Sequence, residues 1–124
     1  MATPVVIPPW AETDEVVLGS SSVNVSALPL FLVSFLICAG QIHRALFNKA
    51  LVITSGNDGQ HVHGSAHYQN KAVDLRSHDL LDDEQALFSS VLLYLSRRYK
   101  VALFDERYTA SPHWHVQTAD SVGG

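Results

Sequence analysis

The hydrophobic pattern predicts two helices. The first lies in the longest apolar run of the chain, residues 27–40, which continues to about residue 47 with charged residues added. Apolar residues occupy nearly every turn of this segment, which indicates a helix packed on a sheet over most of its surface. Pro29 suits the first turn of such a helix, and Ser26 is a candidate N-cap. We expect a buried helix, with an interfacial anchor as the minor alternative, because the run is shorter than the roughly 18 apolar residues that a membrane span needs.

Residues 81–100 contain the clearest helical pattern. Three acidic residues begin the segment and three basic residues end it, an order that complements the helix dipole. Apolar residues recur at the i, i+4 spacing of a single buried face. This face is predicted to comprise Leu87, Val91 and Leu95, with Phe88 and Leu92 beside them.

Short extended segments complete the pattern. Residues 50–56 are rich in β-branched side chains and end at a Gly-Asn-Asp-Gly loop, which predicts a strand followed by a loop. Further strands are predicted at residues 72–76, 101–105 and 113–117, and a loop joins the last two. Together these elements predict an α+β fold, with a small antiparallel sheet packed by two main helices.

Length sets the domain organisation. A chain of 124 residues is long enough for one domain with a real core and too short for two comfortable ones. We assign residues 26–124 to this domain. Residues 1–25 are expected to form an N-terminal arm or a loose hairpin that turns at Gly19 and the serines after it.

Composition excludes several functions. A net charge of −4 with only eight Lys and Arg argues against binding of nucleic acid. Cys38 is the single cysteine, so an internal disulfide and a thiolate-rich zinc site are excluded, and it is expected to be a small core residue. The first residues lack the basic and apolar regions of a secretory signal, which predicts synthesis in the cytoplasm. Oligomeric state is left open.

The remaining chemistry concerns histidines and one aspartate. Seven residues separate His67 from Asp74 in the segment "SAHYQNKAVD". That spacing corresponds to about 10 Å along a helix and more than about 20 Å along a strand, so a shared role requires the chain to turn between them. Asn70 tolerates a left-handed conformation and offers that turn.

The segment "HWH" supplies further candidates. His113 and His115 lie two positions apart, so on a strand both face the same side, while Trp114 faces the other and is expected to anchor the sheet to a helix. Two imidazoles and a carboxylate suit a catalytic zinc ion with an open fourth position. Spacing alone leaves a second interpretation equally open, in which these are surface histidines and Asp74 is a turn carboxylate. His43 and His78 are expected on the polar face of the first helix and in a loop.

These motifs together resemble a known family. "SAHYQNKAVD" followed by "HWH" is similar to the signature Ser-x-His-x-x-Gly-x-Ala-x-Asp … His-x-His of the zinc D-alanyl-D-alanine peptidases of the M15 class, whose fold is shared with the Hedgehog signalling domain. The preceding "ITSG", residues 53–56, resembles the strand end that leads into this motif, and the resemblance spans about residues 26–118. It implies a Zn²⁺-dependent peptidase that cleaves D-Ala-containing peptides of peptidoglycan, as a carboxypeptidase or an endopeptidase.

The resemblance also assigns roles to residues. His67, Asp74 and His115 match the three zinc ligands. Ser65 matches the serine before the first ligand and would support Asp74 or the substrate. His113 matches the first histidine of His-x-His, which polarises the scissile carbonyl or stabilises the oxyanion. Beside the first ligand, Tyr68 is a candidate for a hydrogen bond to substrate, or for packing against the site.

Two departures from the family pattern affect the mechanism. Pro112 stands where many members have a catalytic glutamate, so the base must come from elsewhere, and Glu106 at the end of the preceding strand is the best candidate. The alternative is that Glu106 is a solvated turn residue. Asn57 and Asp58 stand where many relatives have an arginine that holds the peptide carboxylate. Compensating positive charge could come from His61, His63, Lys71 or Arg76.

Three classes of function therefore compete. The first is a zinc peptidase acting on stem peptides of peptidoglycan. The second is a metal-bound binding module without hydrolytic activity, favoured by the missing glutamate and arginine. The third is a structural protein with the same fold, for example a phage or particle component. Small relatives without a signal are often phage proteins delivered to the cell wall, and that context is implied here by the resemblance alone.

Overall fold

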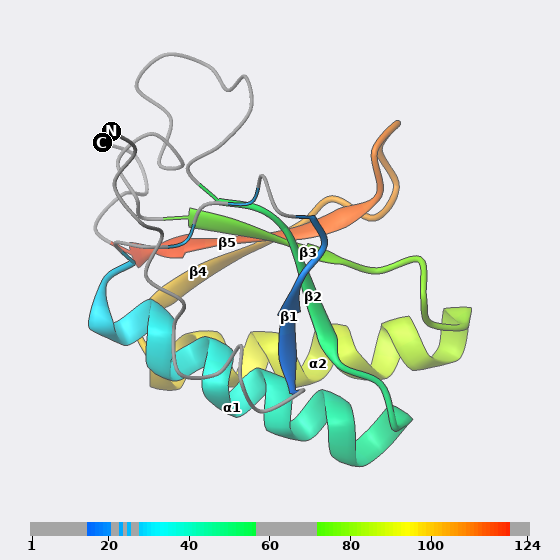
Figure 1. Cartoon of the computed structure of the whole chain (residues 1–124), viewed down its shortest axis with the longest axis horizontal. Helices are drawn as coiled ribbons and strands as arrows, with labels where there is room; N and C mark the ends of the chain where they lie inside the picture. The colour runs from blue at the N-terminus through cyan, green and yellow to red at the C-terminus, as the bar shows by residue number, and fades with distance from the viewer. Residues whose placement is uncertain (1–14, 21–22, 24, 26–27, 57–71, 120–124) are drawn as a thin grey trace.

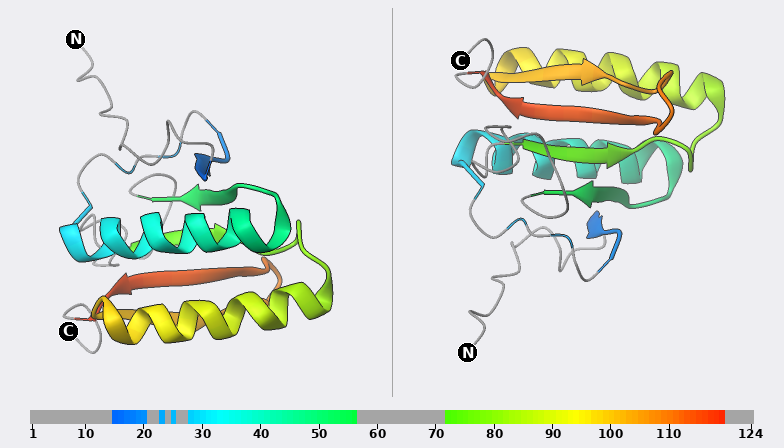
Figure 2. Two further views of the ribbon diagram at one scale, coloured as in Figure 1. Left: turned by 90° about the horizontal axis from the view of Figure 1, so that it is seen from below. Right: turned by 90° about the horizontal axis from the view of Figure 1, so that it is seen from above.

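A five-stranded sheet covered on one face by two helices forms the fold (Figure 1). The computed structural model describes residues 15–20, 23, 25, 28–56 and 72–119. The strands are β1 (Val16–Leu18), β2 (Leu51–Ser55), β3 (Ala72–Arg76), β4 (Val101–Asp105) and β5 (His113–Thr118), and the helices are α1 (Leu30–Phe47) and α2 (Asp82–Arg98). Both helices run side by side across the same face of the sheet (Figure 2). The α+β class is confirmed, and the described part of the opposite face carries no helix.

The sheet is mixed, which corrects the expectation of an antiparallel one. Its strand order is β1-β2-β3-β5-β4, and β1 pairs with β2 in parallel while the other three pairs are antiparallel. Within residues 1–25, expected to form an N-terminal arm or a loose hairpin, the described strand β1 pairs with β2, with Val16 opposite Leu51. The connection from β1 to β2 passes through α1, and a crossover of this length is what parallel neighbours require.

Close packing between α1 and β1 depends on Gly40. A Cβ atom at this position would clash with Cγ2 of Val16 and would lie 3.0 Å from the carbonyl oxygen of Glu15. The missing side chain lets the helix approach β1 closely, and Val16 is fully buried there. Residue 40 thus fixes the position of the edge strand.

The helix ends follow local chemistry. Pro29, not Ser26, occupies the N-cap position of α1, and no side chain caps that end. At the other end Asn48 adopts the left-handed conformation with φ of 55°, and its N–H donates to the carbonyl of Arg44. At the start of α2 the Glu84 carboxylate accepts a hydrogen bond from the backbone N–H of Leu81 at 2.9 Å.

The buried face of α2 is rotated from the predicted one. Phe88, Leu92 and Leu95 lie in the core at i, i+4, i+7 spacing, whereas Leu87 is 48% exposed. The i, i+4 pattern did not distinguish the two adjacent stripes, because both are apolar. Packing against the sheet selects the stripe that contains Phe88.

Trp114 joins the sheet to α2, as predicted. Its side chain is fully buried, and its indole N–H donates to the Ser89 hydroxyl at 2.9 Å. The rings of Trp114 and Phe88 meet edge to face with centroids 5.5 Å apart. Because Trp114 points into the core, its two neighbouring histidines must point out of the opposite face.

His43 corrects another expectation, because it is buried rather than on a polar face. It is 2% exposed, its Nδ1 donates to the Lys49 carbonyl at 2.7 Å, and its ring packs edge to face against Phe47 and Phe88. Burial lowers the pKa of His43, against the opposing effect of the hydrogen bond to the Lys49 carbonyl. His43 is thus a neutral core residue.

Helix α1 is long and apolar enough to cross a membrane by length and composition alone, with a mean hydropathy of 1.7. Core helices of globular domains pass the same test. Here Leu32, Phe35 and Leu36 of α1 pack in the core beneath the sheet. Near its start, Leu30 and Phe31 are exposed.

Candidate metal centre and catalytic site

Asp74 and His115 face each other across the centre of the sheet. They are direct partners in the antiparallel pairing of β3 with β5, and Arg76 pairs with His113 two positions along. Residues two apart on a strand share a face, so all four side chains lie on the face opposite the helices. The structure thus brings together Asp74, His113 and His115, as the sequence predicts.

The contact between Asp74 and His115 is direct. Nδ1 of His115 donates to the carboxylate oxygen Oδ1 of Asp74 at 3.0 Å, and Nε2 lies 2.7 Å from Oε1 of Gln117. Burial of the ring lowers the pKa of His115, but the hydrogen bonds to Asp74 and Gln117 and the negative charges of Asp74 and Glu106 outweigh it, so this pKa is raised. A metal at Nδ1 would therefore have to displace a proton.

His113 lies between two carboxylates. Its Nε2 is 3.5 Å from Oδ1 of Asp74 and 3.4 Å from Oε2 of Glu106. Its Nδ1 contacts the Ser111 carbonyl at 2.5 Å and therefore carries the hydrogen on that side, because a carbonyl can only accept. This second contact holds the ring with Nε2 aimed at the carboxylates.

Glu106 lies where a base for this site is needed. It follows β4 directly, and its backbone exchanges hydrogen bonds with His113, which fixes it opposite that residue. The neighbouring Asp105 is instead held by Arg107, whose Nη2 and Nε lie 2.7 and 2.8 Å from its two carboxylate oxygens. The side-chain hydrogen bond from Arg107 lowers the pKa of Asp105. Only Glu106 of the two acids therefore contacts the candidate site.

The remaining predicted site residues lie outside the described part of the chain. These are Ser65, His67 and Tyr68, together with the turn residue Asn70. The third predicted zinc ligand is thus not placed. Within the described residues alone, no group of three or more His, Cys, Asp or Glu side chains has the geometry of a metal site.

The two described ligands nevertheless fit zinc chemically. Donor atoms of a tetrahedral zinc site lie at about 2.0–2.1 Å from the ion, which places two of them about 3.3 Å apart. Oδ1 of Asp74 and Nδ1 of His115 are 3.0 Å apart, so a small rotation of either side chain would make room between them. A carboxylate and an imidazole are also ligand types that zinc prefers.

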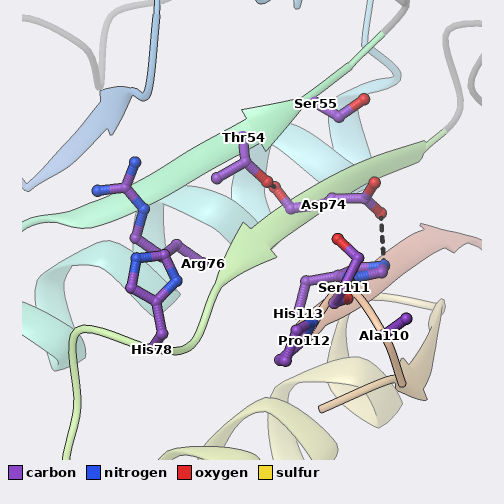
Figure 3. Close-up of a pocket in the computed structure, with 9 residues that line it drawn as sticks. All are labelled: Thr54, Ser55, Asp74, Arg76, His78, Ala110, Ser111, Pro112 and His113. Carbon is purple, nitrogen blue, oxygen red and sulfur yellow. Dashed lines mark hydrogen bonds and ion pairs between the residues drawn. The ribbon is translucent and has the colours of Figure 1, made fainter. Parts of the chain in front are cut away.

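A cavity of about 460 Å³ opens beside this cluster (Figure 3). Asp74 and His113 point toward each other at one side of it, and the Arg76 and His78 side chains lie together at the other. The lining is completed by residues from β2 and from the β4–β5 connection: Thr54, Ser55, Ala110, Ser111 and Pro112. Pro112 thus forms part of the wall and contributes no titratable group.

Sequence reasoning missed one member of the cluster. Gln117 fixes the far nitrogen of His115, and it continues the alternation of His113 and His115 on one strand face. This alternation along the strand could have predicted from the sequence that Gln117 lies on the same face as the two histidines. Oriented supports of this kind hold the ring of a ligand histidine in place.

Comparisons of the chain with protein-family models, with curated proteins and with solved structures found no match. The geometry of the described residues and the chemistry of the motifs therefore carry the functional argument.

Proposed function

We propose that the chain is a zinc-dependent peptidase that cleaves D-Ala-containing peptides of peptidoglycan. The observation that carries the proposal is the cluster of Asp74, His113, His115 and Glu106 on the sheet face that lacks a described helix, beside a cavity that Asp74 and His113 line. These residues come from three different strands or strand ends, so the fold, not local sequence, brings them together. Peptidoglycan as substrate follows from the resemblance to the M15 class.

Asp74 and His115 would hold the metal together with His67. When bound, zinc supplies a Lewis acid for the scissile carbonyl and lowers the pKa of a water molecule. Asp74 supplies the negative charge of the ligand set. Gln117 holds the His115 ring so that Nδ1 faces the carboxylate.

Glu106 would act as the general base, and His113 would stabilise the oxyanion. The carboxylate of Glu106 is 41% exposed, so it can take a proton from the attacking water and pass it to the leaving amine. His113 presents Nε2 to the same space, where an N–H would donate to the oxyanion of the substrate.

A digest of purified muropeptides by the zinc-loaded protein, read by mass spectrometry, tests the proposal. We expect loss of D-Ala or cleavage within a stem peptide, abolished by a chelator. Glu106→Gln should lower turnover by about 100-fold or more, because general-base catalysis typically contributes that much. Glu84→Gln is the matched control, since glutamine also serves in a capping box, and it should leave turnover unchanged.

A metal-bound module without hydrolytic activity is the second candidate. The observations in its favour are that Glu106 forms its ion pair with His113, and that Pro112 stands where the resemblance places the base. One zinc per chain without any cleavage of muropeptides would select this candidate.

A further inference from the structure

Helix α1 is apolar on more sides than the core covers. Its mean hydropathy is 1.7, while only 33% of the helix is buried inside the domain. A helix that is apolar all round is normally enclosed by protein or in contact with lipid. The most exposed large apolar side chains of α1 lie in its first turn, where Leu30 is 77% and Phe31 is 54% exposed. The start of α1 therefore presents an apolar surface to the surroundings of the domain.

Three basic residues lie at the same end of the helix layer. Figure 2 shows that the end of α2 lies beside the start of α1. Nζ of Lys100 is 5.6 Å from the centroid of the Phe31 ring, so the two groups belong to one continuous surface. Arg97 and Arg98 in the last turn of α2 are exposed, and within the described part of the chain no ion pair involves these three basic residues.

Negative charge is kept away from this end of the domain, although the whole chain has a net charge of −4. The described ranges 28–33 and 94–102 contain no Asp or Glu. The acidic residues of α2 occupy its first turn, at the opposite end of a helix of 17 residues. That helix is about 25 Å long, well beyond the Debye length of about 8 Å at physiological ionic strength. The potential around Phe31 and Lys100 is therefore positive.

Exposed apolar side chains beside free arginine and lysine match the chemistry of an anionic bilayer surface. Apolar side chains enter the boundary between headgroups and acyl chains, while basic side chains are attracted to the anionic headgroups. Tyr94, 63% exposed and one turn before Arg98, is of a residue type enriched at this boundary. The face with Asp74 and His115 is opposite the helices, so a bilayer at the helix layer would leave the candidate site open.

We propose that the start of α1 and the end of α2 form a docking surface for membranes that contain anionic lipids. Leu30 and Phe31 enter the interface, and Arg97, Arg98 and Lys100 bind the lipid phosphates. Helix α1 stays packed on the sheet, so binding is peripheral and reversible. The inference stands on the helix layer alone and does not rest on the proposed peptidase function.

Co-sedimentation of the full chain with vesicles tests the docking surface. We expect binding to vesicles of phosphatidylcholine mixed with phosphatidylglycerol, weakened by added salt, and at least about tenfold weaker binding to phosphatidylcholine alone. The double variant Arg97→Gln, Arg98→Gln should lower the partition coefficient about 25-fold, because each basic residue near such a surface contributes about fivefold. Phe31→Ser should lower it about tenfold through lost apolar burial.

Two matched controls lie near the other end of α1. Arg44→Gln removes an exposed arginine and Leu46→Ser removes a leucine that is 47% exposed, and both variants should bind like the wild type. Phe31 and Leu46 are 15 residues apart, about 22 Å along the helix, so the controls leave the docking surface unchanged.

Three results would overturn the docking surface: no binding by the wild type, equal binding to both kinds of vesicle, or unchanged binding by the double variant and Phe31→Ser. A lipid-free dimer in light scattering that Phe31→Ser dissociates would also overturn it and would assign the surface to a second copy of the chain. Cleavage of muropeptides is not measured in these experiments, so failure of this inference is distinct from failure of the peptidase proposal.

Discussion

Replacement of Asp74 by asparagine separates the role of this carboxylate as a metal ligand from its role as a hydrogen-bond acceptor. The asparagine side chain would keep an oxygen that accepts from His115 but would lose the negative charge. Both side chains are mostly buried, with 14% and 16% exposed for His115 and Asp74. Loss of the charge from this hydrogen bond should cost about 1 kcal/mol in the metal-free protein. For a domain of this length that corresponds to about 4 °C in Tm.

Added zinc should produce a larger difference in Tm between the wild type and Asp74→Asn. A ligand present at 100 times its Kd stabilises the folded state by about 2.7 kcal/mol, which raises Tm by about 10 °C here. The wild type should show this rise in differential scanning fluorimetry, and Asp74→Asn should show little or none because one of its ligands has lost its charge. Asp105→Asn is the matched control, since it breaks the ion pair with Arg107 but leaves the cluster intact. A full zinc-induced rise in Asp74→Asn would refute the assignment of Asp74 as a ligand.

Two further predictions concern the fold. The variant His43→Phe should have a free energy of unfolding about 1 kcal/mol lower than that of wild type at pH 7.5, because the hydrogen bond to the Lys49 carbonyl is lost. The pKa of His43 is lowered in the folded state, so its contribution to stability is complete above about pH 6.5 and is lost progressively as the pH falls below that value. The difference between the two proteins in urea unfolding should therefore shrink at pH 5, and an unchanged difference would contradict a neutral, buried His43. The variant Gly40→Ala should be less stable than wild type by about 1–3 kcal/mol in the same assay, because the added Cβ would clash with Val16 and this cost exceeds the gain in helix propensity. Equal or greater stability would show that β1 does not pack on α1 as described.

Local patterns sufficed for most elements of the fold. The two helices and the strands β2 to β5 lie within a few residues of their predicted positions, because periodicity and helix-end charges are local signals. Parallel pairing of β1 with β2 was missed, because it depends on a crossover through α1 that no short stretch encodes. The burial of His43 was missed for a similar reason, since its partner Phe88 comes from the other helix.

The candidate site was partly predictable. Alternation along β5 placed His113 and His115 on one face, and the fold adds Asp74 opposite them and Glu106 beside them. Of the four candidates for positive charge, Arg76 lines the cavity, and His61, His63 and Lys71 lie outside the described residues. His67 lies outside the described residues, so its role as the third ligand stays a prediction.

Titration of metal-free protein with zinc, with release of D-Ala from a D-Ala-D-Ala peptide measured at each step, tests the central claim most directly. Activity should rise in proportion to zinc and level off at one equivalent per chain, because the proposed set of ligands, built on Asp74 and His115, would hold a single ion. Binding of one equivalent without release of D-Ala, or release that does not depend on zinc, would contradict the account.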